Sequence, residues 1–82
     1  MKKKRIANKK PLDKKTRLYY DALKEFDKLD LYYREIPYNY QLQIDTINYW
    51  TTSQKWYNTY TKEKGMGFNN LKMYLKKNYY IA

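Results

Sequence analysis

The stretch NYWTTSQKWYNTYTKEKGMG, residues 48–67, holds two tryptophans and three tyrosines within its first thirteen positions. Rings at this density form either the wall of a hydrophobic core or a surface on which nucleobases stack. Because the chain contains few leucine, isoleucine and valine residues, its aromatic rings must supply much of the core. We therefore interpret the stretch mainly as core, and we retain Trp56 and Tyr60 as candidate stacking or partner contacts.

When the sequence around this stretch is placed on a helix, its apolar residues shift from one side of the helix to another. Those of residues 40–47 lie on one side. Tyr49, Trp56 and Tyr60 lie on roughly the opposite side, and Trp50 and Tyr57 lie between the two groups. One straight helix would be apolar over most of its circumference. Two helices broken at residues 51–53 explain the shift more simply, since threonine and serine are poor interior helix residues and good caps. We favour a kink or break there, and residues 40–64 form either one kinked helix or two.

The segments on either side also have helical periodicity. Upstream, apolar residues recur on one helical face over residues 18–36, and Asp13 is the expected N-cap. Pro37 is expected to end this helix near residue 35. Downstream, Gly65 and the two lysines before it are typical of a helix C-terminus, and a last helix follows with its lysines opposite an apolar side.

These patterns predict an all-α protein, a small bundle of three to four helices with a flexible basic N-terminal arm. The arm covers residues 1–13, where like charges repel and almost nothing apolar is present. The helical domain covers residues 14–82, and no strand pattern competes well with helix anywhere in it. The predicted helices are about 14–35, 40–51, 53–64 and 70–79.

The composition argues against an enzyme. The chain has no histidine and no cysteine, which removes the usual general base, the usual zinc ligands and the thiol nucleophile. Its two glycines do not form a phosphate-binding loop, and its tyrosines lack the histidines or arginine cluster of a tyrosine nucleophile. We expect no catalytic residues, no metal site and no cofactor.

The formal net charge is +10, and it is concentrated at the two ends of the chain. The middle of the chain is slightly acidic, and such an excess of basic residues usually indicates an anionic partner. The lysines of the last predicted helix join the N-terminal ones in one basic surface only if the fold brings both ends together. The candidate nucleic-acid-binding residues are Lys2, Lys3, Lys4, Arg5, Lys9, Lys10, Lys14, Lys15, Arg17, Lys72, Lys76 and Lys77.

The sequence favours a small basic nucleic-acid-binding protein whose binding is mainly electrostatic and sequence-tolerant. Its composition suits a phage or mobile element, in packaging, as a virion component or as an accessory factor. The alternative is a protein-binding module, such as a phage-type inhibitor of a host enzyme or a structural subunit of a larger assembly.

We expect DNA or RNA as the partner, single- or double-stranded, with a protein partner or a second copy of the chain as the alternatives. No apolar run approaches a membrane span, and the basic N-terminus lacks the apolar stretch of a signal peptide. The expected setting is therefore intracellular, in the host cytoplasm, or within a virion.

Overall fold

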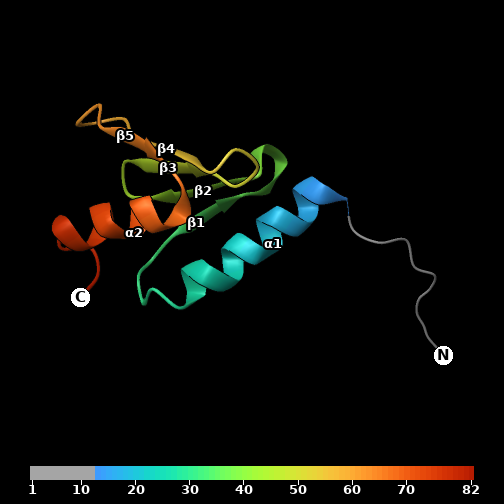
Figure 1. Ribbon diagram of the computed structural model, residues 1–82, viewed down its shortest axis with the longest axis horizontal. Coiled ribbons are helices and arrows are strands. Elements are labelled where there is room, and N and C mark those ends of the chain that lie inside the picture. The colour runs from blue at the N-terminus through green and yellow to red at the C-terminus, as the bar shows by residue number, and fades with distance from the viewer. Residues whose placement is uncertain (1–12) are drawn as a thin grey trace.

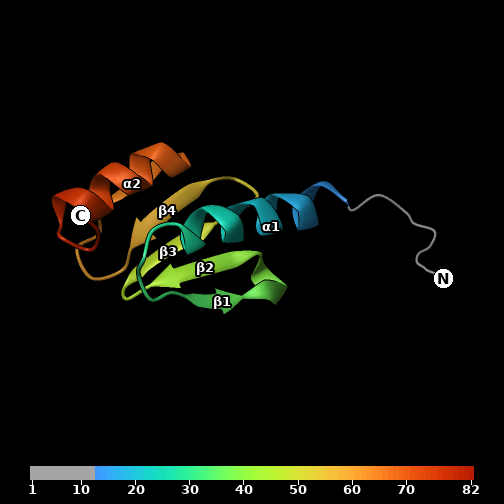
Figure 2. The same ribbon diagram turned by 90° about the horizontal axis from the view of Figure 1, so that it is seen from below.

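In the computed structural model, which describes residues 13–82, five short strands form one antiparallel sheet accompanied by two helices. The strands pair in the order of the sequence, β1-β2-β3-β4-β5, and both helices lie on the same face of the sheet (Figures 1 and 2). The elements are α1 (Lys14–Asp27), β1 (Arg34–Ile36), the 3-10 turn η2 (Pro37–Asn39), β2 (Gln41–Ile44), β3 (Ile47–Trp50), β4 (Lys55–Asn58), β5 (Lys64–Met66) and α2 (Phe68–Lys77).

The prediction of an all-α helical bundle is wrong, because the protein is an α+β fold. The predicted helices 40–51 and 53–64 are strands and turns, and residues 48–67 run through β3, β4 and β5. In β2, β3 and β4, side chains alternate between the helix-covered face and the opposite face. Since aromatic or aliphatic residues occur on both faces of β3 and β4, the alternation resembles a helix that is apolar on several sides.

The two helices were located correctly, but α1 is shorter than predicted. Asp13 is its N-cap as expected, and the Asp13 carboxylate accepts a hydrogen bond of 2.8 Å from the Thr16 amide. The helix ends at Asp27 rather than residue 35, and Asp30 then adopts a left-handed φ of 55° that turns the chain towards β1. The last helix, α2, begins and ends two residues before the predicted 70–79.

Each of the three turns that follow β2, β3 and β4 contains one residue with a left-handed φ, and none of these residues is glycine. They are Asp45 (φ 54°), Gln54 (φ 62°) and Lys62 (φ 69°). Glycine and asparagine are the usual residues at such positions, so the sequence lacks the ordinary signal of a hairpin. The predicted break at residues 51–53 falls in the turn between β3 and β4, which connects strands rather than helices.

The core lies between the sheet and the helices and is rich in aromatic rings, as the composition predicted. Phe26 of α1 packs with its ring centroid 5.5 Å from that of Tyr49 on β3 and 5.8 Å from that of Phe68 on α2. Leu71 and Leu75 of α2 are fully buried beside them. One aromatic cluster thus joins both helices to the centre of the sheet.

A second contact joins α2 to the edge of the sheet. Trp56 on β4 lies directly opposite Gly65 on β5, and its indole Nε1 donates a hydrogen bond of 2.9 Å to Asn70 Oδ1 on α2. The Trp56 ring also packs against Tyr74, with the centroids 4.4 Å apart. A Cβ at position 65 would lie 2.7 Å from the Trp56 Nε1 and closer still to Asn70 Oδ1, so only glycine fits beneath the indole.

Substituting Gly65→Ala is expected to lower the free energy of unfolding by about 1–3 kcal/mol, because the added methyl overpacks the Trp56–Asn70 contact. The matched control on the same strand is Lys64→Ala, an exposed position where the change is expected to stay within about 0.5 kcal/mol. Urea denaturation followed by circular dichroism measures both. Equal stability of Gly65→Ala and the wild type would contradict this packing.

Substituting Gln54→Gly is expected to raise the free energy of unfolding by about 0.5–1 kcal/mol. Glycine relieves the left-handed φ at an exposed position, and its greater freedom in the unfolded chain offsets part of the gain. The control is Thr52→Gly, in the same turn but without a positive φ, which is expected to destabilise. A loss of stability in both variants would show that the turn conformation is not strained.

Candidate nucleic-acid interface

The sheet has one face that neither helix covers (Figure 2). Directly paired residues of neighbouring strands point to the same face, so the strand register assigns two residues of each strand to this side. We call it the open face. Its residues are Arg34, Ile36, Gln41, Gln43, Asn48, Trp50, Lys55, Tyr57, Lys64 and Met66.

The open face carries cations and no carboxylate. Arg34, Lys55 and Lys64 are exposed, and they come from β1, β4 and β5. Lys55 pairs across the strands with Trp50, and Lys64 pairs with Tyr57, so each ring has a cation directly beside it. This combination of rings and cations suits an anionic ligand that has flat groups.

The carboxylates of the sheet and its turns lie on the helix side, where tyrosine hydroxyls bind them. Tyr19 donates to Glu35 at 2.9 Å, and Glu35 is on the opposite face from its neighbour Arg34. The other two bonds run from Tyr80 to Asp45 (3.1 Å) and from Tyr74 to Glu63 (2.7 Å). Glu35 is therefore kept off the open face, whereas Asp45 lines a hollow at its edge together with Arg34 and Gln43.

The pKa values of Tyr19, Tyr80 and Glu63 shift in the direction expected when a tyrosine hydroxyl donates to a carboxylate. Burial first, and then the hydrogen bond to Glu35, raise the pKa of Tyr19. Burial and the bond to Asp45 raise the pKa of Tyr80 in the same way. The hydrogen bond from Tyr74 lowers the pKa of the Glu63 carboxyl, so this group stays ionised at neutral pH.

Trp50 and Tyr57 are the two aromatic rings of the open face. Both are half-buried, Trp50 near one end of β3 and Tyr57 on the neighbouring β4. Asn48 lies directly opposite Tyr57 and two residues before Trp50, so the rings are diagonal neighbours around it. Rings spaced in this way across a sheet can each stack one base of an unpaired strand.

A network of side-chain amides orders the centre of the open face. Gln41 and Gln43 both donate to the Oδ1 of Asn48, at 2.6 and 3.0 Å. Arg34 donates to Gln43 Oε1 at 2.7 Å, and Asn39 donates to Gln41 Oε1 at 3.2 Å. The surface between the rings is therefore polar and preorganised.

Some of the predicted basic residues lie near this face. Lys2, Lys3, Lys4, Arg5, Lys9 and Lys10 are outside the described residues. Lys14, Lys15 and Arg17 are exposed in the first turns of α1, and the Lys15 ammonium lies 5.9 Å from the centroid of the Tyr40 ring. Because Tyr40 immediately precedes Gln41, this end of α1 adjoins the Gln41 end of β2.

The lysines of α2 lie elsewhere. Lys72 lines a hollow together with Lys28 and Asp30, which follow the C-terminal end of α1. Lys76 and Lys77 belong to the last turn of α2, at the end of the molecule far from the start of α1 (Figure 1). In the described part of the chain, the fold therefore does not join the basic residues of the two ends into one surface.

The two aromatic candidates have different environments. Trp56 is 4% exposed and belongs to the core, where both its ring and its indole N–H are engaged by α2. Tyr60 is 82% exposed in the loop between β4 and β5. Sequence reasoning missed Trp50 and Tyr57, and the signal that could have found them is the alternation in QLQI, INYW and KWYN, residues 41–44, 47–50 and 55–58.

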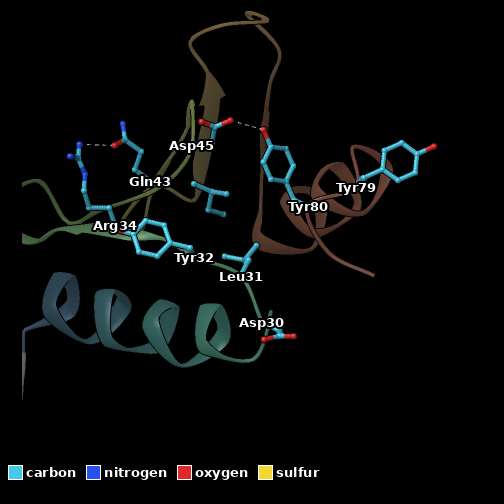
Figure 3. Close-up of a pocket in the computed structure, with 9 residues that line it drawn as sticks. Asp30, Leu31, Tyr32, Arg34, Gln43, Asp45, Tyr79 and Tyr80 are labelled. Atoms are coloured by element: carbon cyan, nitrogen blue, oxygen red, sulfur yellow. Dashed lines mark hydrogen bonds between the residues drawn. The ribbon is translucent and has the colours of Figure 1, made fainter.

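A shallow hollow of about 680 Å³ lies beside the open face, between the β1–β2 edge and the C-terminal residues. Figure 3 shows the Arg34–Gln43 and Asp45–Tyr80 hydrogen bonds at its border. Asp30 and Asp45 line it, so it is less suited to a polyanion than the open face. Within residues 13–82, no group of three or more potential ligands could hold a metal ion.

Comparison of the chain with protein-family models, curated proteins and solved structures returned no match. Neither helix in the described range is long and apolar enough to cross a lipid bilayer.

Iodide quenching of tryptophan fluorescence tests the exposure and charge of the open face. Iodide is expected to quench Trp50 and to leave the buried Trp56 largely unaffected, so the quenchable emission disappears in Trp50→Phe. Because Arg34, Lys55 and Lys64 attract anions, caesium at the same ionic strength is expected to quench Trp50 less. Equal iodide quenching of wild type and Trp50→Phe would contradict this assignment.

Proposed function

We propose that this protein binds single-stranded nucleic acid on the open face. The observation that carries the proposal is the placement of Trp50 and Tyr57 beside Arg34, Lys55 and Lys64 on a sheet face that has no carboxylate. Bases would stack on the two rings while the cations contact phosphates. This refines the expectation of electrostatic, sequence-tolerant binding by naming the surface.

A single strand fits this surface better than a duplex. Stacking on Trp50 or Tyr57 requires a base whose flat face is free, and a paired base in a duplex has none. Neither helix lies on the open face, so no helix is in position to enter a major groove from it. Base stacking on an aromatic side chain contributes about 1–3 kcal/mol per base and tolerates different bases.

The cations make the proposed binding depend on salt. Contacts from Arg34, Lys55 and Lys64 to three phosphates give a slope of roughly −2 in a plot of log K against log salt. Lys15 lies over the Tyr40 ring on the helix side of the sheet, next to the Gln41 end of β2, and adds positive charge at that edge of the sheet. Further basic residues precede Lys15 in the sequence and would make the slope steeper.

A protein-binding function is the second candidate, and the hollow in Figure 3 favours it. Tyr32 and Tyr79 both line that hollow and are 86% and 94% exposed. Exposed tyrosines are frequent anchors of protein interfaces, and Asp30 and Asp45 add negative groups that a polyanion would avoid. This surface is separate from the two rings of the open face, so variants can distinguish the two functions.

Titration of labelled single-stranded and duplex oligonucleotides at about 50 and 200 mM salt tests the proposal. The wild type is expected to bind the single strand more tightly, and Trp50→Ala and Tyr57→Ala each to weaken that binding about 5- to 100-fold by removing a stacking ring. Tyr60→Ala is the matched control, since it removes an exposed tyrosine outside the open face.

The lysines give a second comparison. The double variant Lys55→Ala and Lys64→Ala is expected to reduce affinity and to flatten the salt slope by roughly 1.4. The double variant Lys76→Ala and Lys77→Ala is the control, because it loses the same net charge from α2. It is expected to weaken binding less than the variant of Lys55 and Lys64. Absence of binding by the folded protein at 50 mM salt would contradict the proposal and favour the protein-binding alternative.

A further inference from the structure

Asn48 occupies the centre of the open face, between the two rings. It lies directly opposite Tyr57, and its side chain is on the same face as that of Trp50 two residues later. The residue is 6% exposed, although neither helix covers it, because its neighbours on the sheet surround it. A base stacked on either ring would bring its edge near this amide.

The Asn48 amide is held in one orientation. Its Oδ1 accepts hydrogen bonds from both Gln41 and Gln43, which fills the acceptor capacity of a carbonyl oxygen. Its Nδ2 amino group donates to no residue in the described part of the chain. No fully buried side-chain nitrogen or oxygen among those residues lacks a partner, so this amino group reaches the surface.

The other two amides of the face are engaged as well. Gln43 Oε1 accepts from Arg34, and Gln41 Oε1 accepts from Asn39. Lys55 and Lys64 contribute only donors. Each amide oxygen of the centre therefore accepts at least one hydrogen bond, and only the Asn48 oxygen, which accepts two, is filled. Together with the lysines, the surface offers a ligand more donors than free acceptors.

We propose that the Asn48 amino group donates to a carbonyl oxygen of a stacked base, so that the site prefers carbonyl-bearing bases over adenine. This inference rests on the proposed function. An asparagine that recognises adenine needs its oxygen as an acceptor for the adenine amino group, and here that oxygen is occupied. Thymine and uracil present two carbonyl oxygens to this donor, whereas adenine has no carbonyl oxygen and carries an amino group beside its ring-nitrogen acceptors, which requires an acceptor in turn.

The experiment compares the affinities of wild type and Asn48→Asp for oligothymidylate, oligoadenylate and an abasic oligonucleotide of equal length. Aspartate keeps the oxygen that accepts from Gln41 and Gln43 and removes the donor. The thymidylate-to-adenylate affinity ratio is expected to fall about three- to tenfold in Asn48→Asp, the size of one hydrogen bond. The abasic oligonucleotide measures the loss caused by the added negative charge alone.

A second measurement needs no protein variant. Replacing thymine by difluorotoluene, which has the same shape without carbonyl oxygens, is expected to weaken binding to the wild type about three- to tenfold. Equal affinity for the two oligonucleotides would overturn the inference. So would equal loss of affinity for all three oligonucleotides in a folded Asn48→Asp protein.

These outcomes differ from failure of the proposed function. If the wild type binds oligothymidylate no more tightly than the abasic oligonucleotide, then the rings do not stack bases and the proposed function itself is wrong. If the wild type binds base-containing strands more tightly, but the thymidylate-to-adenylate ratio is unchanged in Asn48→Asp, then only the role of Asn48 is wrong.

Discussion

The packing of Trp56 over Gly65 fixes which side chains reach the open face. The indole fits only against a residue without a Cβ, and its hydrogen bond to Asn70 ties β4 and β5 to α2. This contact holds the register of the two strands, and a slip by one residue would exchange the two faces of a strand. Tyr57 and Lys64 point away from the helices because Trp56 and Gly65 meet beneath α2.

The tyrosines determine how charge is distributed across the sheet. Arg34 and Glu35 are neighbours in sequence, yet strand alternation and the Tyr19–Glu35 bond place them on opposite faces. Tyr80 and Tyr74 bind the carboxylates of the turns in the same way. The tyrosines therefore have a second effect besides packing, since the Tyr19–Glu35 bond holds a carboxylate on the face opposite Arg34.

The parts of the fold that sequence reasoning located are those whose signals are local. Asp13 as a cap, α2 and the aromatic core follow from short-range patterns. The strands do not, because left-handed residues such as Gln54 and Lys62 form the turns without glycine, and the alternation within each of β2, β3 and β4 extends over only four residues. The pairing between strands determines which residues lie on the open face. Trp50 is assigned to it once the register has placed Trp56 on the opposite, helix-covered face.

The amide network explains how a face without a covering helix can carry aromatic rings and remain compatible with water. Burying Gln41 and Asn48 would be costly if their polar groups were unpaired, but the network satisfies them and orients Asn48. Aliphatic residues at these positions would form a continuous apolar patch with Trp50 and Tyr57, which favours aggregation. The amides separate the rings instead, and the hydrogen bonds that satisfy the Asn48 oxygen leave its amino group without a partner among the described residues and not fully buried. The same arrangement of amides therefore satisfies the buried oxygens and presents hydrogen-bond donors to a ligand.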